Sequence, residues 1–493
     1  MSLVSNGVKL TELKNKNKCS IPAPNFARKA KTTASPREGS IRPRPSREFD
    51  KAFPKKLSKN LKTLWQNWCG ARILILGFGR EGRDTFEFLR KLFPEKVLGV
   101  GDRNENVKCQ MSNVKKIKWH LGKNYLGALK NYDVIIKSPG IPFKILPKAA
   151  LPKITTQTEI FFENCPGRII GITGTKGKST TASLIYQILK SGGVKVRLLG
   201  NIGRPVLTSL LKTKKDDVFA YELSSHQLYN LKQSPHVAVI LNVYPEHLDY
   251  YRNFKEYVNA KANITRGQTK RDYLIYNSRD LLVKKIAKKS RAKKLSIQGK
   301  YYQLDIAAAK RVGEIFKIPE KTILKAIREF KSLPHRLEFV GKFKGIEFYN
   351  DSLSTIPETT IEALDFLGNK VQTLILGGFD RGLDFKKLAR RVLKSEVKTL
   401  ILFPTTGERI LKEIQTGRSR VSTKIQHFFI NSMKNAVKLA YEHTNGGKIC
   451  LMSPASPSFG IFRDYREKGN LFKKWAKKLG KSLENEIEGD IIN

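Results

Sequence analysis

The chain has 493 residues and carries 93 Lys and Arg against 43 Asp and Glu, a formal net charge of +50. This length is too great for one ordinary hydrophobic core, and no apolar run approaches the roughly 20 residues of a membrane-spanning helix. The composition therefore argues against a helical membrane protein. It predicts a soluble, cytoplasmic protein of two to four domains, with no secretory signal and with five scattered cysteines typical of reduced thiols.

The chain begins with a basic segment that lacks apolar periodicity. Residues 1–60 hold 15 Lys and Arg against 4 Asp and Glu, with many Pro and Ser. Such a segment cannot bury enough surface to offset its chain entropy, so we predict a basic disordered tail over 1–66. The remaining positive charge lacks the interleaved aromatic residues of a single-strand-binding groove, which favours a solvated surface over a specific nucleic-acid partner. A nucleic-acid-binding module stays open as an alternative.

Three stretches of the chain repeat the order of apolar strand, glycine turn and helix that is typical of an open parallel sheet. Leu-Pro pairs interrupt the pattern near 152 and 334. We therefore predict an α/β protein of three domains, with a short tail after them. The predicted domains cover 67–151, 152–334 and 335–482, and the tail covers 483–493.

The first predicted domain contains GFGREG, in which Gly77, Gly79 and Gly82 form a GxGxxG pattern, and Asp102 ends the next strand. This spacing is a dinucleotide-binding fingerprint, because the glycines let a backbone turn approach a diphosphate at the start of a helix. An NAD-dependent oxidoreductase is the natural hypothesis from this motif alone.

The second predicted domain opens with GITGTKGKST at 171–180, an apolar strand that leads through a glycine-rich turn into a helix. Backbone N–H groups of such a turn attract phosphates, a lysine adds a point charge, and a hydroxyl can reach magnesium. The strict P-loop formula would place its first glycine at Ile172, where this chain departs from it. The segment still predicts an ATP site formed by Gly174, Thr175, Lys176, Gly177, Lys178, Ser179 and Thr180.

Further polar groups follow strands of the same domain. Glu222 begins ELSSHQL at a strand end, LNVYPEHLDYY carries His247, and Lys261 lies on the helical segment that follows. With GITGTKGKST, GNIGRPVL, LPHRLEF, YNDSLSTIPETT and SPASPSFGIFRDYREKGN, these segments resemble the Mur ligase family over about residues 70–480. The resemblance covers nearly the whole chain outside the basic tail.

The resemblance implies an ATP-dependent amide ligase that activates a carboxylate as an acyl phosphate, with cations neutralising the crowded oxygens. It implies a Rossmann-like UDP-binding domain, a central P-loop ATPase-type domain with a parallel sheet, and a C-terminal Rossmann-like domain. Catalysis is assigned to Lys178, His247 and Lys261. Two Mg²⁺ ions are assigned to Thr180, Glu222, His247 and Lys261, the last as a carbamate that can act as a carboxylate-like ligand.

The resemblance also distributes three substrates over the three domains. A UDP-sugar would contact Arg80, Glu81, Asp102, Ser138, Gly140 and Asn201, and ATP would add Arg336 and Asp351. An incoming amino acid would contact Thr355, Arg381, Ser458 and Tyr465.

The chain departs from the family pattern at several of these positions. Leu353 stands where one member has a lysine, and Arg381 replaces another lysine, although arginine can still clamp a carboxylate. Tyr301, Tyr302 and Asp305 replace residues that usually contact ATP through amides, so aromatic stacking on adenine is a possible substitute.

Three motifs indicate which member of the family the chain resembles. ELSSHQL, SPGIP and GGFDRGLDF favour the member that joins D-glutamate to UDP-N-acetylmuramoyl-L-alanine in peptidoglycan precursor synthesis, and the DNPR signature of the diamino-acid-adding member is missing from the sequence. Another amino-acid step of the same family is the alternative. We expect a monomer.

Overall fold

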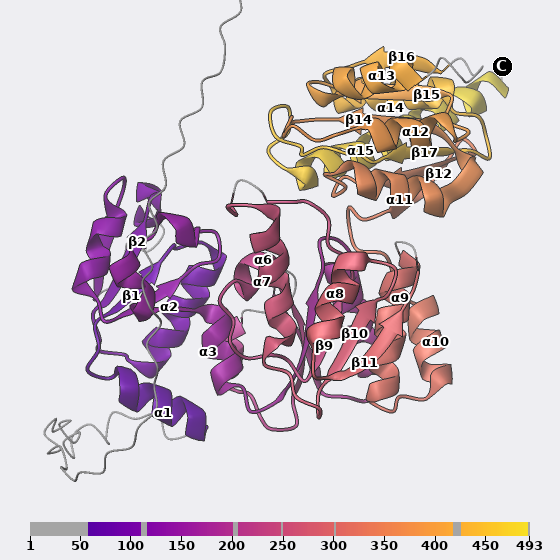
Figure 1. Ribbon diagram of the computed structural model, residues 1–493. Helices are drawn as coiled ribbons and strands as arrows, with labels where there is room; N and C mark the ends of the chain where they lie inside the picture. Colours follow the sequence, from indigo (N-terminus) through magenta and orange to yellow (C-terminus); the bar gives the residue numbers. More distant parts are fainter. Residues whose placement is uncertain are drawn as a thin grey trace, which may run out of the picture. The chain divides into compact units, whose positions relative to one another are not determined.

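The computed structural model describes residues 58–109, 116–200, 206–247, 250–299, 302–417 and 425–491, with side chains described as far as 481. The backbone forms three sheets in successive stretches of the chain (Figure 1). This arrangement confirms the predicted α/β class with parallel sheets.

The first sheet has the strand order β3-β2-β1-β4-β5, and every pairing in it is parallel. Gly77 follows β1 at φ +90°, and a Cβ on Gly82 would collide with the Gly77 carbonyl, so the turn needs glycine at both positions. The strands and helices of this part are β1 (Ile73–Leu76), β2 (Leu98–Asp102), β3 (Ile117–Leu121), β4 (Val134–Lys137), β5 (Ile154–Thr156), α1 (Lys59–Trp68), α2 (Arg80–Leu92) and α3 (Gln157–Asn164), with 3-10 turns η2 (Glu105–Val107), η4 (Tyr125–Asn131), η5 (Phe143–Ile145) and η6 (Lys148–Lys153).

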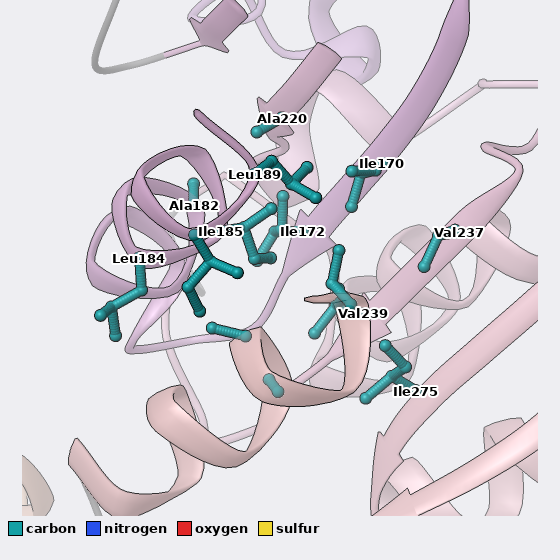
Figure 2. Close-up of a cluster of buried hydrophobic side chains, with 14 of the residues drawn as sticks. Ile170, Ile172, Ala182, Leu184, Ile185, Leu189, Ala220, Val237, Val239 and Ile275 are labelled. Atoms are coloured by element: carbon teal, nitrogen blue, oxygen red, sulfur yellow. The ribbon is translucent and has the colours of Figure 1, made fainter. Parts of the chain in front are cut away.

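The second sheet has the order β11-β10-β9-β6-β8-β7 and is also fully parallel. Ile172 of β6 lies beside Ile185 and Leu189 of α4 in the buried cluster that Figure 2 shows. Its elements are β6 (Arg168–Thr173), β7 (Val196–Gly200), β8 (Val218–Glu222), β9 (Val237–Ile240), β10 (Tyr273–Asn277), β11 (Lys293–Ile297), α4 (Lys178–Ser191), α5 (Val206–Leu210), α6 (Ser225–Leu228), α7 (Phe254–Arg266), α8 (Leu281–Lys289), α9 (Tyr302–Ile315) and α10 (Glu320–Arg328).

The third sheet has the order β12-β13-β17-β14-β15-β16, in which only the β12–β13 pair is antiparallel. Neighbouring side chains of β14 point to opposite faces of the sheet, so Leu374 belongs to one buried cluster and Ile375 to another. The elements are β12 (Glu338–Phe343), β13 (Ile346–Asn350), β14 (Val371–Gly377), β15 (Thr399–Phe403), β16 (Gln426–Phe429), β17 (Ile449–Met452), α11 (Pro357–Leu367), η7 (Gly368–Lys370), α12 (Lys386–Leu393), α13 (Thr406–Gly417), α14 (Met433–His443) and α15 (Tyr465–Ile491).

The structure corrects the predicted ends of the folded region. Helix α1 begins at Lys59 and buries Leu61, Leu64 and Trp65, so the prediction of disorder is wrong for 59–66, while 1–57 lie outside the described residues. The backbone of α15 runs into the predicted tail 483–493 as far as Ile491. Strand β5 joins the first sheet although it follows the boundary predicted at 151, and the domain boundaries themselves stay predictions.

Membrane insertion through a helix finds no support in the part of the chain that the structure describes, because none of its helices is both long and apolar enough to cross a bilayer.

Candidate active site

The glycine-rich turn at 174–177 connects the end of β6 to the first residue of α4, Lys178. Gly177 caps the helix at φ +86°, and a Cβ there would collide with the Asp305 carboxylate. The backbone N–H of Lys176 donates to Asn242 Oδ1 at 2.8 Å and fixes the turn against the loop after β9. The first backbone N–H groups of α4 therefore form an anion-binding site at the N-terminus of the helix.

Lys178 extends from the first turn of α4 back over the glycine-rich turn. Its ammonium donates to the carbonyls of Gly174 at 3.0 Å and Thr175 at 2.9 Å. Burial lowers the pKa of Lys178 to about 8, although Glu222 and Glu246 oppose this shift. An anion bound beside it would favour the charged ammonium, so the side chain is suited to neutralise a phosphoryl group.

Glu222 ends β8 with a carboxylate that is only partly satisfied. The side chain is 2% exposed, and Ser179 Oγ donates to its Oε1 at 3.0 Å. Its Oε2 is buried without a hydrogen-bond partner among the described residues. A buried carboxylate oxygen without a partner costs free energy unless a cation or a water molecule binds it. This oxygen is therefore suited to be a magnesium ligand.

The described residues supply only part of a metal shell. No group of three His, Cys, Asp or Glu side chains lies close enough in them to hold an ion. An ion next to Glu222 would need oxygen ligands from hydroxyls, phosphates or water, as is usual for Mg²⁺.

Lys261 and His247 approach the same turn from α7 and from the loop after β9. Lys261 is 1% exposed, and burial followed by repulsion from Lys178 lowers its pKa well below the ordinary value. Burial also lowers the pKa of His247, and Lys261 adds to that shift. His247 adopts φ +59°, an uncommon conformation for a residue with a side chain. Both groups are thus biased toward their neutral forms.

A cavity of about 770 Å³ lies over this turn and is lined by residues that follow strands of all three sheets. Arg336 Nη2 donates to Ser179 Oγ at 3.3 Å, and Lys176 Nζ donates to Thr355 Oγ1 at 3.5 Å. Those among its lining residues that the sequence indicated are Arg80, Glu81, Ser138, Gly140, Thr175, Lys176, Lys178, Ser179, Glu222, His247, Arg336, Asp351, Thr355 and Tyr465.

Asp351 braces the segment that carries Arg336. Its carboxylate accepts from the Leu337 backbone N–H at 3.1 Å and from Ser453 Oγ at 2.8 Å, and burial raises its pKa to about 6. His335 and Leu337, on either side of Arg336, both adopt positive φ, at 68° and 43°. The guanidinium is therefore presented from a turn whose unusual backbone is held by a buried acid.

Residues 172–345 match the model of the Mur ligase middle domain. The chain is 32% identical over 446 residues to the UDP-N-acetylmuramoylalanine--D-glutamate ligase of Clostridium tetani, covering 83% of this chain and 97% of that protein. The corresponding ligase of Acetivibrio thermocellus is 33% identical over 449 residues, covering 82% and 95%. The chain belongs to the Mur ligase family. This membership decides against the NAD-dependent oxidoreductase suggested by the GxGxxG spacing.

Two solved structures of Mur ligases share the fold at low sequence identity. The UDP-N-acetylmuramate-alanine ligase of Thermotoga maritima aligns with a TM-score of 0.52 at 14% identity, over 84% of this chain and all of that one. A MurF ligase from Thermotoga maritima in complex with ADP aligns at 0.51 and 17% identity, over 83% and 96%. The three-domain Mur ligase fold is thereby supported for this chain.

Several predicted contacts of this Mur ligase lie beside the cavity instead of lining it. Asp102 accepts from the Phe78 backbone N–H at 2.6 Å and so braces the glycine turn after β1. Lys261 lies beneath the phosphate-binding turn, within hydrogen-bond distance of Gly174. Asn201, like Tyr301, lies outside the described residues.

At the nucleotide end of the site, the neighbouring hydroxyls of Ser179 and Thr180 have different surroundings. Ser179 is the hydroxyl that contacts Glu222, whereas Thr180 lines a second cavity of about 240 Å³. Asp305 accepts from Thr181 Oγ1 at 2.8 Å, and burial raises its pKa to about 7. That cavity is lined in part by the aromatic side chains of Tyr302, Phe339, Tyr349 and Phe366, next to Gly177. Stacking of adenine on these rings stays a prediction.

The amino-acid end contains one cation that sequence reasoning missed. Arg381 lies 5.9 Å from the centre of the Phe459 ring and is not among the cavity-lining residues, whereas Arg466 lines the cavity beside Tyr465 and Leu353. Ser458 Oγ is buried and has no hydrogen-bond partner within the described part of the chain. Arg466 could have been found from its place next to Tyr465 in the predicted site.

Glu246 is a second residue that the sequence analysis passed over. Its Oε1 lies 2.9 Å from Lys176 Nζ in an ion pair, and Glu246 lines the same cavity. Burial opposes its ionisation, but Lys176, His247 and Lys178 together lower its pKa to about 2. Its neighbour His247 was the available signal, because the pair EH lies in the loop after β9, beside other polar groups of the site.

Proposed function

We propose that this chain joins the amino group of D-glutamate to the carboxyl group of UDP-N-acetylmuramoyl-L-alanine while ATP is converted to ADP and phosphate. The observation that carries the proposal is a shared cavity. It is lined by the glycine turn after β1, by the phosphate-binding turn after β6 and by Arg336, which precedes β12. The names of the relatives from Clostridium tetani and Acetivibrio thermocellus supply the substrates.

The first step would transfer the γ-phosphoryl group of ATP to the carboxylate, which forms an acyl phosphate and releases ADP. Lys178 and Arg336 would neutralise the crowded oxygens, and the N–H groups at the start of α4 would hold the nucleotide phosphates. The amine would then attack the acyl carbon and release inorganic phosphate, with the formation of the amide bond. Holding the acyl phosphate within the cavity would reduce its contact with water and so limit its hydrolysis.

Magnesium would supply charge neutralisation in this step. Glu222 fits one ion through its unpartnered Oε2, and the contact of Ser179 with the same carboxylate places that hydroxyl close by. Thr180 stays a predicted ligand on the basis of the resemblance. His247 and a carbamate on Lys261 would serve a second ion. The carbamate would form when the neutral Lys261 amine adds to carbon dioxide and loses a proton.

UDP contacts would come from Arg80, Glu81, Ser138 and Gly140, with Asp102 and Asn201 as further candidates. The incoming amino acid would contact Thr355 and Tyr465, with Ser458 and Arg381 retained as candidates from the resemblance. We place the reaction in the cytoplasm and expect a monomer. Another amino-acid step of the Mur ligase family is the competing function.

The test is ADP release from purified enzyme with Mg²⁺, ATP and UDP-N-acetylmuramoyl-L-alanine, comparing D-glutamate with L-glutamate, L-alanine and a diamino acid. The proposal requires turnover with D-glutamate well above the rest. Preference for another amino acid would assign the chain to a different step, and no ADP with any of them would overturn the ligase activity.

A further inference from the structure

The four-residue turn Ser138–Ile141 follows β4, and all four residues line the main cavity. Ser138 Oγ donates to the Gly77 carbonyl at 2.7 Å, which ties this turn to the glycine turn after β1. The two turns therefore form one backbone surface at the first-domain end of the cavity.

Side-chain donors from Lys137 and Tyr250 bind carbonyls of this turn. Lys137 Nζ donates to the carbonyls of Ser138 at 2.9 Å and Ile141 at 2.7 Å. The Tyr250 hydroxyl lies 3.0 Å from the Pro139 carbonyl and 3.1 Å from that of Ile141, so its one hydrogen is shared between them. A carbonyl oxygen that faced a diphosphate would repel it. Because these donors bind three carbonyls of the turn, they keep those oxygens from turning toward the substrate.

Tyr250 lies between β9 and α7, three residues after His247. Its ring centre lies 4.1 Å from that of His226 in an edge-to-face arrangement, and His226 lies 4.7 Å from His247. Burial raises the pKa of the Tyr250 hydroxyl, so it stays a donor. Tyr250 is not itself among the cavity-lining residues. It touches both the turn that would hold the nucleotide sugar and His226, whose ring meets that of His247 edge to face beside the phosphate-binding turn.

We propose that Tyr250 is a positioning residue for the nucleotide-sugar substrate, acting through the turn Ser138–Ile141 with its hydroxyl and through His226 and His247 with its ring. The inference rests on the proposed function, because it assigns the diphosphate end of that substrate to this turn. The two contacts of Tyr250 are separable: the hydroxyl sets substrate affinity, and the ring sets the placement of His247 for turnover.

The separation is tested with Tyr250→Phe and Tyr250→Leu. Tyr250→Phe removes the hydroxyl and keeps the ring, so KM for UDP-N-acetylmuramoyl-L-alanine should rise about fivefold to tenfold, as expected for one lost hydrogen bond, while kcat and the KM for ATP stay within twofold. Tyr250→Leu also removes the ring contact with His226, so kcat should fall in addition.

Tyr229→Phe is the matched control. Tyr229 stacks on Phe143 at 4.9 Å and its hydroxyl donates to Glu256, so it lies near the same turn while its hydroxyl bonds elsewhere. This variant should leave all kinetic constants within twofold. Melting temperatures of the three variants show whether each is folded.

Equal KM values in Tyr250→Phe and wild type would overturn the inference, as would a uniform rise in the KM of all three substrates. Titration calorimetry with UDP as the probe provides a readout that does not need turnover. Weaker UDP binding in Tyr250→Phe than in Tyr229→Phe supports the inference even if wild type forms no ADP, a result that would overturn the proposed function alone. Equal UDP binding in both variants contradicts it.

Discussion

The Lys261 ammonium donates a 2.8 Å hydrogen bond to the carbonyl of Gly174, the first residue of the phosphate-binding turn. The side chain is almost fully buried, and its pKa is lowered first by burial and then by Lys178. A neutral amine is the form that adds carbon dioxide. Lys261→Ala should therefore lower kcat on the order of 100-fold, the effect of removing one group that organises transition-state charge. Steady-state ADP release measures this change.

The modification itself has a direct readout. Enzyme equilibrated with ¹³C-bicarbonate should give a carbamate carbon signal in NMR spectra that is missing from Lys261→Ala. Full turnover of wild type after removal of bicarbonate and carbon dioxide would contradict the role of Lys261 as a modified metal ligand.

Lys178→Met should abolish ADP formation while leaving UDP binding within about threefold, because the ammonium faces the phosphate-binding turn and not the first-domain end of the cavity. Calorimetry with UDP and an ADP-release assay measure the two effects separately. Lys190→Met makes the same substitution in the last turn of the same helix and should leave both unchanged. A large loss of UDP binding in Lys178→Met would show that the two ends of the cavity are not independent.

Arg466 is expected to attract the second carboxylate of the incoming amino acid, since Leu353 on the same cavity wall carries no charge. Its side chain is 67% exposed, so the interaction is screened and worth at most about 1 kcal/mol. Arg466→Ala should raise KM for D-glutamate about fivefold and leave KM for ATP unchanged. Leu353→Lys in the Arg466→Ala background should restore part of the affinity, and its failure to do so would remove Arg466 from the amino-acid site.

Much of the fold could be predicted because local patterns and tertiary structure agree. Apolar strands followed by glycine turns predicted parallel sheets, and β1, β6 and β14 are buried along almost their whole length. The phosphate-binding turn was predictable because position 177 requires glycine for two reasons. Its φ is positive, and a Cβ there would collide with the Asp305 carboxylate.

The remainder depended on side-chain directions that a motif does not specify. The adjacent hydroxyls of Ser179 and Thr180 both fit a magnesium role in sequence, yet only Ser179 contacts Glu222. Arg381 stays a predicted carboxylate clamp, and its guanidinium lies 5.9 Å from the ring centre of Phe459, a contact that the motif does not specify. Such choices depend on the rotamer and on neighbours far away in the chain.

Helix α1 illustrates a different limit, because an averaged composition concealed a periodic segment. Leu61, Leu64 and Trp65 have helical spacing, and Trp65 stacks on Phe93 with ring centres 6.5 Å apart. Burial of each such side chain contributes about 1.5–3 kcal/mol. A chain that starts at Ser58 should keep turnover within a few fold, whereas one that starts at Asn67 should lose several degrees of melting temperature. Equal melting temperatures of the two truncations would show that α1 adds no stability.

Lys468 gives a pH-dependent prediction outside the proposed chemistry. It is 1% exposed, its ammonium donates to the Gly377 carbonyl at 2.8 Å, and burial lowers its pKa to about 7. In the unfolded chain the pKa of lysine is about 10.4. Below pH 7 both states are protonated, and the folded state carries the full cost of a buried charge. Between pH 7 and about 10.4 the unfolded state binds the extra proton, so this group makes the free energy of unfolding rise with pH.

Lys468→Met removes that titration. The free energy of unfolding of wild type minus that of Lys468→Met should therefore increase from pH 6 to pH 9.5, by a few kcal/mol and at most about 4. Urea denaturation at both pH values and at one between them measures it. Lys474→Met, at an exposed position of the same helix, should give a difference from wild type that does not change with pH. A flat profile for Lys468→Met would mean that Lys468 keeps its charge throughout, because the Gly377 carbonyl and the rings of Phe403 and Phe462 compensate its burial.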